Sequence, residues 1–147
     1  LPIELYMELI GVSIQRVLLR GKIDRLDIFP DSTLRVTDYK TGTPRTRNDI
    51  LGLTKSSSGD YFRQLAFYKL CMGLEGRGEL REACIDFIEP QKNGSYRLES
   101  FVIEQQSVDE LRDTITRVAE EVYTLSFWDK GCKKPDCEYC ALRADIS

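Results

Sequence analysis

The chain has 147 residues, 41% hydrophobic and 31% charged, with a formal net charge of −3, as expected for one soluble globular domain with a core of its own. No apolar run approaches the ~20 residues that a membrane-spanning helix needs, and the slight acidity does not exclude nucleic-acid binding, because basic contacts can be local. The absence of histidine excludes Ser-His-Asp and Cys-His catalysis, so any chemistry must use carboxylates, lysine, tyrosine, cysteine or a metal.

Residues 2–10 alternate between apolar and polar side chains, which is typical of a half-buried strand. Glu4 and Glu8 fall on the polar side of this strand. A turn follows, and residues 14–20 are predicted to form a second strand that leads into a hairpin.

The next stretch, residues 23–39, predicts that hairpin. Two runs of apolar and β-favouring residues flank a Pro-Asp-Ser turn, and centring the hairpin on Asp31 pairs Asp24 with Asp38. Because side chains alternate with a period of two, both carboxylates and Lys40 share one face.

Two carboxylates that face each other across a ladder repel and weaken a sheet. A divalent cation between them would remove the repulsion, and oxygen ligands of this kind suit Mg²⁺ or Mn²⁺. Lys40 could then hold a water or stabilise charge on a phosphate. If the register differs by one or two residues, Asp24 and Asp38 are simply solvated, and both interpretations remain open.

Residues 43–59 form a polar, turn-rich segment directly after Lys40. Its basic residues Arg45, Arg47 and Lys55 predict a loop that contacts the phosphate backbone of a nucleic acid. A solvated, flexible loop is the alternative.

Residues 60–74 are predicted to be a helix with Asp60 as its N-cap. Gln64 and Tyr68 are four residues apart and share a helix face. Taken alone, such a pair has no functional meaning.

Residues 83–88 and 96–103 are predicted strands that Asn93-Gly94, a strong hairpin signal, connects. A long helix over residues 107–127 follows, with Ser107 and Glu110 as a capping box. Its apolar residues recur at helical spacing and are predicted to be core: Leu111, Ile115, Val118, Val122 and Leu125. Phe127 and Trp128 are expected to seal its end.

Cys132, Cys137 and Cys140 lie within nine residues, and the last two have the spacing of metal ligands. Cys71 and Cys84 could offer a fourth thiolate, but both fall in predicted core elements. We favour free thiols in a reducing, cytoplasmic setting over a zinc or iron–sulfur site.

Three motifs, in this order and spacing, resemble the RecB/AddB-type branch of the PD-(D/E)XK nuclease superfamily. They are GKIDRLD around Asp24, DYKTG with Asp38 and Lys40, and QLAFY with Gln64 and Tyr68. The resemblance covers residues 4–86 well and the C-terminal cysteines in part.

The resemblance implies a mixed α/β fold with a restriction-endonuclease-like core, in which helices flank a central, mostly antiparallel sheet. We expect one nuclease domain over residues 1–147 with a cysteine-containing tail over residues 130–147. Because the chain starts on Leu1 rather than Met, we expect it to be a fragment of a larger protein.

The resemblance also implies an activity, that of a Mg²⁺- or Mn²⁺-dependent DNA nuclease, an exonuclease rather than an endonuclease. The implied metal ligands are Asp24, Asp38, the backbone carbonyl of Tyr39 and Glu4, with Glu8 as a second choice to Glu4. The implied catalytic set is Asp24, Asp38, Lys40, Gln64 and Tyr68.

Relatives of this kind act in DNA repair and recombination beside a helicase domain, in the same or a partner chain. Many hold a [4Fe–4S] cluster through a cysteine trio and a distant cysteine. Here Ile146 stands where the last cysteine of the trio is expected, so we do not expect the cluster in this fragment. Two alternatives remain: a degenerate nuclease fold that only binds DNA or a partner protein, and a structural metal module built on the cysteine tail.

Overall fold

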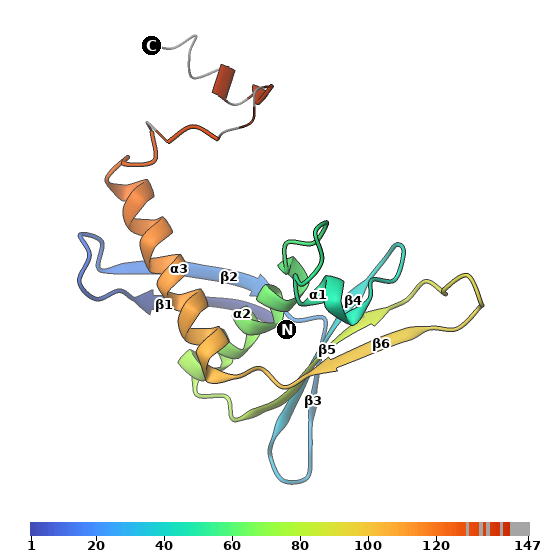
Figure 1. Ribbon diagram of the computed structural model, residues 1–147. Helices are drawn as coiled ribbons and strands as arrows, with labels where there is room; N and C mark the ends of the chain where they lie inside the picture. The colour runs from blue at the N-terminus through green and yellow to red at the C-terminus, as the bar shows by residue number, and fades with distance from the viewer. Residues whose placement is uncertain (129, 133, 135, 139, 142–147) are drawn as a thin grey trace.

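Figure 1 shows the computed structural model, which describes residues 1–128, 130–132, 134, 136–138 and 140–141. The first half of the chain contains β1 (Pro2–Glu8), β2 (Arg16–Lys22), β3 (Arg25–Ile28), β4 (Leu34–Lys40) and the short helix α1 (Arg47–Ile50). The second half contains α2 (Asp60–Glu75), β5 (Leu80–Phe87), β6 (Arg97–Phe101) and α3 (Gln105–Tyr123). No helix among the described residues is long and apolar enough to cross a membrane.

The strands form two sheets. An antiparallel pair, β1–β2, stands apart from a four-stranded sheet of order β3-β4-β5-β6. In the larger sheet only β4 and β5 are parallel, and parallel neighbours need a long crossover connection, which α1 and α2 supply. The expected mixed α/β class with mostly antiparallel pairing is confirmed, although the first hairpin forms a sheet of its own.

Helix α2 holds the two sheets together. It contacts β1 of the small sheet, β5 of the large sheet, and both other helices. Its buried residues are Leu65, Ala66, Tyr68, Leu70, Cys71 and Met72. They pack in one core with buried residues of β4 and β5, so the central parallel pair is fixed against the helix that carries the third motif.

The central hairpin has the predicted register at Leu26↔Val36 and Ile28↔Leu34. The ladder nevertheless begins at Arg25, so Asp24 lies in a bend just before it and is not a ladder partner of Asp38.

The segment after β4 contains a helix that the sequence did not predict. In α1, Thr46 and Asp49 form a capping box, and Ile50 is fully buried. Farther along, Gly52 and Gly59 approach so closely that a Cβ on Gly52 would lie 2.9 Å from the Gly59 nitrogen. The segment is therefore held at both ends rather than merely solvated.

Helix α2 begins one residue earlier than predicted, at Asp60 itself. Its N-cap is Gly59, in the left-handed conformation at φ 68°, which suits glycine. Asp60 lies in the first turn, where its carboxylate accepts a hydrogen bond from Arg45.

Helix α3 differs more from the prediction. It begins at Gln105, and its N-cap Glu104 makes no side-chain capping bond, so the predicted Ser107–Glu110 capping box is wrong. Val108 is its only buried residue, whereas Val118 and Val122 are 45% and 57% exposed. The prediction of a core stripe is therefore wrong for the C-terminal half, which lies beside the first hairpin, where Glu120 accepts hydrogen bonds from Ser13 (Figure 1).

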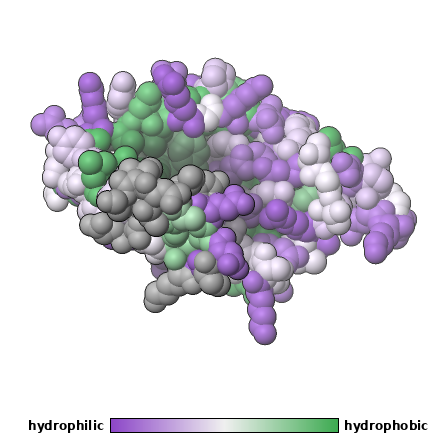
Figure 2. Space-filling model, turned by 90° about the horizontal axis from the view of Figure 1, so that it is seen from above, coloured by the Kyte–Doolittle hydropathy of each residue, from purple (hydrophilic) through white to green (hydrophobic). Residues whose placement is uncertain are grey.

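Beyond α3, Phe127 and Trp128 are 40% and 50% exposed and pack edge to face against each other. An apolar cavity lies beside this half of the helix, lined by Ile14 and Val17 from the first hairpin and by residues from Thr114 to Tyr123. Figure 2 shows hydrophobic side chains gathered around a hollow in the surface.

Candidate active site

The polar cluster of the molecule lies where β4 faces α2. Asp38 and Lys40 are two residues apart on β4, so their side chains leave the strand on the same side. Gln64 and Tyr68 are one turn apart on α2 and face that side of the strand. The predicted second and third motifs therefore meet.

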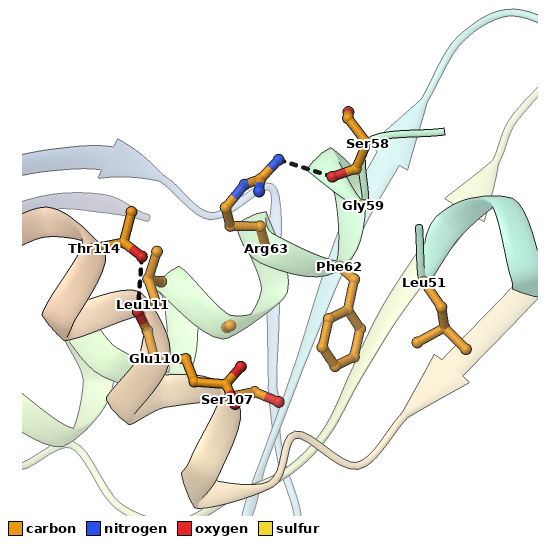
Figure 3. A pocket seen from close by; sticks show the side chains of 10 residues that line it. Leu51, Ser58, Gly59, Phe62, Arg63, Ser107, Glu110, Leu111 and Thr114 are labelled. Carbon is orange, nitrogen blue, oxygen red and sulfur yellow. Dashed lines mark hydrogen bonds between the residues drawn. The ribbon is translucent and has the colours of Figure 1, made fainter. Parts of the chain in front are cut away.

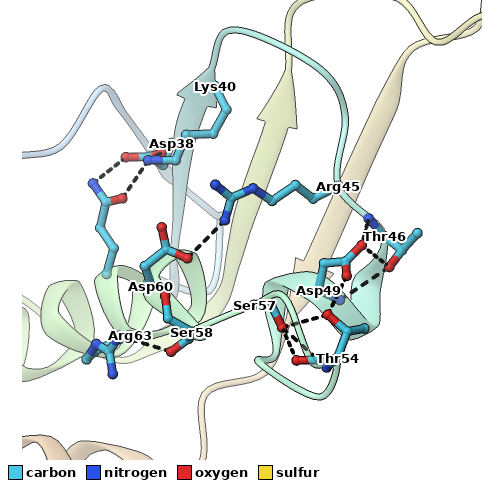
Figure 4. A network of polar contacts seen from close by, with 11 residues as sticks. Asp38, Lys40, Arg45, Thr46, Asp49, Thr54, Ser57, Ser58, Asp60 and Arg63 are labelled. Atoms are coloured by element: carbon cyan, nitrogen blue, oxygen red, sulfur yellow. Dashed lines mark hydrogen bonds and ion pairs between the residues drawn. The ribbon is translucent and has the colours of Figure 1, made fainter. Parts of the chain in front are cut away.

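Gln64 connects the two charged groups of β4. Its Nε2 donates to Asp38 Oδ1 at 2.8 Å, and its Oε1 accepts from Lys40 Nζ at 2.6 Å. Lys40 Nζ also lies 2.7 Å from Asp38 Oδ2. Asp38, Lys40 and Gln64 thus form a closed ring of polar contacts, part of which Figure 4 shows.

The Tyr68 hydroxyl adds a fourth group to the ring. It donates to Asp38 Oδ1 at 2.9 Å, accepts from Gln64 Nε2 at 2.8 Å and lies 3.1 Å from the carbonyl oxygen of Lys22. Burial, followed by the hydrogen bond to Asp38, raises the pKa of Tyr68 well above its ordinary value. The hydroxyl therefore keeps its proton at neutral pH and donates a hydrogen bond to Asp38.

Asp38 is a buried charge, only 3% exposed, and such a charge is costly unless it is paired. Lys40 provides the pairing charge. Oδ2 of Asp38 is buried, and within the described part of the chain it makes an ion pair with Lys40 Nζ at 2.7 Å but accepts no hydrogen bond. A divalent cation that took the place of the ammonium would find in Oδ2 the kind of oxygen ligand it prefers.

The side chain of Asp24 contacts the backbone of the same strand, β4. Its Oδ2 accepts a hydrogen bond from the Tyr39 N–H at 3.0 Å, just beyond the end of the β3–β4 ladder. The carboxylate of Asp24 is thereby bound one residue from Asp38, and the hydrogen bond from Tyr39 uses one of its two oxygens. The donor set of Asp24 and Asp38 fits a hard cation.

Glu4 lies apart from this cluster. Its carboxylate pairs with Arg20 at 3.1 Å on the exposed face of the first hairpin. Glu8 is also exposed. A third acidic ligand would have to lie close to both Asp24 and Asp38. Among the described residues, no acidic side chain has an oxygen within 4.8 Å of oxygens of both aspartates when these also lie within 4.8 Å of each other.

The three basic residues of the segment after β4 have different surroundings. Arg45 donates to Asp60 at 2.9 Å at the edge of the site (Figure 4). Arg47 is bound to the edge strand β6, where it donates to the carbonyl oxygen of Ser100 at 2.9 Å. Lys55 is exposed. Of the three, Arg45 lies nearest the polar cluster.

Tyr61 is a site residue that the sequence analysis missed. Its ring centroid lies 4.5 Å from Lys40 Nζ and 4.0 Å from the guanidinium carbon of Arg45. The available signal was its spacing, because Tyr61 precedes Gln64 by three residues and thus shares its helix face.

The cysteine trio does gather. The Sγ atoms of Cys132, Cys137 and Cys140 all lie within 4.8 Å of one another, which matches three of the four positions of a tetrahedral thiolate site. Cys71 and Cys84 are buried in α2 and β5, as predicted. The position of Ile146, and part of the tail, lie outside the described residues.

A separate cavity lies between α2 and α3 (Figure 3). It has a volume of about 260 Å³, and its lining includes Phe62, Arg63, Glu110 and Leu111 but none of the four clustered groups. A second, polar cavity of about 360 Å³ is lined by Arg45, Asp60 and residues of α1 and the serine-rich segment. Only the second cavity adjoins the site.

Comparison with known families accounts for this geometry. The family model of the PD-(D/E)XK nuclease superfamily matches residues 2–144. A comparison with curated proteins gives no match. Asp38-Tyr39-Lys40 has the D-x-K pattern that the superfamily's name describes, and the match spans nearly the whole chain. The chain therefore belongs to the PD-(D/E)XK nuclease superfamily.

Proposed function

We propose that this chain is a metal-dependent deoxyribonuclease that hydrolyses phosphodiester bonds in DNA. The observation that supports this function is the ring of Asp38, Lys40 and Gln64, closed by contacts of 2.6 to 2.8 Å. The ring brings an anionic ligand and a cation together beside a strand end, and membership of a nuclease superfamily agrees with it.

The metal would be Mg²⁺ or Mn²⁺, because the donors are carboxylate and carbonyl oxygens. Asp24 and Asp38 would hold it, with the backbone carbonyl of Tyr39 as a further ligand. When bound, the ion would polarise a phosphoryl oxygen and lower the pKa of a coordinated water. Glu4 would have to leave Arg20 to join this set.

The protein groups then have separate tasks. The Lys40 ammonium, with a side chain 18% exposed, can neutralise charge that develops on the reacting phosphate or orient the attacking water. Gln64 fixes Lys40 and Asp38 relative to each other. Tyr68, which donates to Asp38 Oδ1, keeps the carboxylate of Asp38 in one orientation.

End-labelled single- and double-stranded DNA with Mg²⁺ or Mn²⁺ provides the test. Lys40→Ala should lower cleavage by about 10²–10³-fold, the usual effect of losing one group that stabilises the transition state. Lys92→Ala is the matched control, because Lys92 is an exposed lysine in the β5–β6 turn. Both variants should keep the wild-type circular dichroism spectrum.

Cleavage by Lys40→Ala at the wild-type rate would overturn the assignment. If wild type and both variants are folded and bind DNA without cutting it, the chain is a binding module instead.

We further propose that the enzyme is a RecB/AddB-like exonuclease that works with a helicase in DNA repair and recombination. The order and spacing of the three motifs support this. An exonuclease should degrade linear DNA from an end and leave circular single-stranded DNA intact. Cutting of the circle at a similar rate would show an endonuclease.

A further inference from the structure

Both cations at the edge of the site lie against one aromatic ring. The ring centroid of Tyr61 is 4.5 Å from Lys40 Nζ and 4.0 Å from the guanidinium carbon of Arg45. Both distances are well inside the ~6 Å within which the negative face of a ring attracts a cation. The Tyr61 ring is therefore a shared contact between a residue of β4 and a residue of the next segment.

The ring itself is held in place. Tyr61 lies in the first turn of α2 and is half-buried, and its centroid is 6.3 Å from that of Phe87, which is 1% exposed. Within the described part of the chain, the Tyr61 hydroxyl makes no hydrogen bond. Its aromatic face, rather than its hydroxyl, thus makes the contacts that matter here.

Each cation also has one acidic neighbour. Lys40 pairs with buried Asp38, whereas Arg45 pairs with Asp60, a side chain that is 46% exposed. An exposed ion pair is weak in water, so a phosphate can replace Asp60 as the partner of Arg45. Lys40 and Arg45 would otherwise repel each other, and their common contact with an electron-rich ring offsets that repulsion.

We propose that Tyr61 is a positioning residue that holds Lys40 and Arg45 as a pair for two phosphates of one DNA strand. Lys40 meets the reacting phosphate, and Arg45 meets a neighbouring one. The inference rests on the proposed nuclease function and adds to it the recognition of a second phosphate beside the scissile bond. Nothing in the arrangement reads the bases, so it serves cleavage without sequence preference.

Tyr61→Leu removes the aromatic face but keeps an apolar contact for Phe87, and Tyr61→Phe keeps the face. DNA binding is measured on a single-stranded oligonucleotide in Ca²⁺, and cleavage in Mg²⁺. Tyr61→Leu should weaken binding about tenfold at low salt. The slope of log K against log salt should fall by about 0.7, the value for one lost phosphate contact on a single strand.

Tyr61→Phe should behave as wild type within twofold in both assays. Tyr96→Leu, at a tyrosine that is 69% exposed and directly precedes β6, controls for the loss of a surface ring. Thermal unfolding of each variant identifies any that is not folded. A merely structural role would change stability but leave the salt slope unchanged.

A double variant provides a second line of evidence. If Tyr61 acts through Arg45, the effects of Tyr61→Leu and Arg45→Gln on the dissociation constant should be less than additive. Additive effects, or a Tyr61→Leu variant with the wild-type salt slope, would overturn the proposal while wild type still cleaves. A wild-type chain that neither cleaves nor binds DNA would overturn the nuclease function and the Tyr61 role together.

Discussion

The hydroxyl of Tyr68 donates a hydrogen bond to the buried carboxylate of Asp38 across 2.9 Å and so joins α2 to β4. Asp38 carries a charge into the core, and Tyr68 is 2% exposed, so neither group has water as a substitute partner. The contact is part of the site and part of the packing at once.

Replacing Tyr68 with Phe removes the hydroxyl and keeps the ring. Asp38 then loses a donor and Gln64 an acceptor, so the free energy of unfolding should fall by about 1–3 kcal/mol. Urea titration measures that change. Tyr96→Phe, at an exposed ring, should have no measurable effect on stability, and equal effects of the two variants would contradict the role assigned to Tyr68.

The two aspartates should differ when their charge is removed. Asp24→Asn keeps an amide oxygen for the Tyr39 N–H, so the fold should be retained while Mn²⁺ binding, measured by calorimetry, weakens. Asp38→Asn leaves the Lys40 ammonium without its partner in a largely buried position, so both Mn²⁺ binding and stability should fall. Wild-type Mn²⁺ affinity in both variants would remove the metal site from this place.

Stability should also fall at alkaline pH. Burial raises the pKa of the Cys71 thiol from 9.0 to about 12, and burial raises the pKa of Tyr68 as well. Between pH 9 and 12 the unfolded chain loses these protons while the folded chain keeps them, so rising pH favours unfolding. The stabilisation is complete below pH 9 and is lost as the pH rises through the native pKa values.

Chemical denaturation at several pH values from 8 to 11 measures this slope. Cys71→Ala removes one of the two titrating groups, so its free energy of unfolding should decline less steeply with pH than that of wild type. An identical slope would show that Cys71 does not titrate differently in the folded and unfolded states.

The exposed half of α3 predicts a contrast between two apolar residues. Leu65 is fully buried in α2, whereas Val122 is 57% exposed. Leu65→Ala should cost about 2–5 kcal/mol of unfolding free energy, and Val122→Ala should change it by less than about 0.5 kcal/mol. A large cost at Val122 would mean that this face of α3 is covered in solution.

Local rules predicted much of this fold. The turn around Asp31 sets the register of the central hairpin, because pairing in a hairpin follows from the position of its turn. The spacing of Asp38 with Lys40, and of Gln64 with Tyr68, predicted which side chains leave each element together. The sequence could not show by itself that the two pairs meet at hydrogen-bonding distance, because that depends on how α2 crosses from β4 to β5.

The predictions that were wrong or missing also have physical causes, because each depends on contacts beyond the local sequence. Periodicity identified the apolar face of α3 but not the extent of the layer beneath it, so Val118 and Val122 were placed in the core. Hairpin symmetry predicts Asp24 as a ladder partner of Asp38, yet the Asp24 carboxylate replaces the next ladder bond by accepting a hydrogen bond from the Tyr39 N–H. Tyr61 was missed because its contact with Lys40 joins residues that are distant in sequence.

The residues that contact one another in the Asp38 cluster are far apart in the sequence, which affects the order of folding. Tyr68 contacts Asp38 and Lys22 across 30 and 46 residues of chain, and Gln64 contacts Lys40 across 24. The β3–β4 hairpin can form early from local contacts, but it must carry the Asp38 charge in water until α2 docks, because distant contacts form late. Activity regained during refolding would therefore report the closure of the β4–α2–β5 crossover, later than any signal from the hairpin.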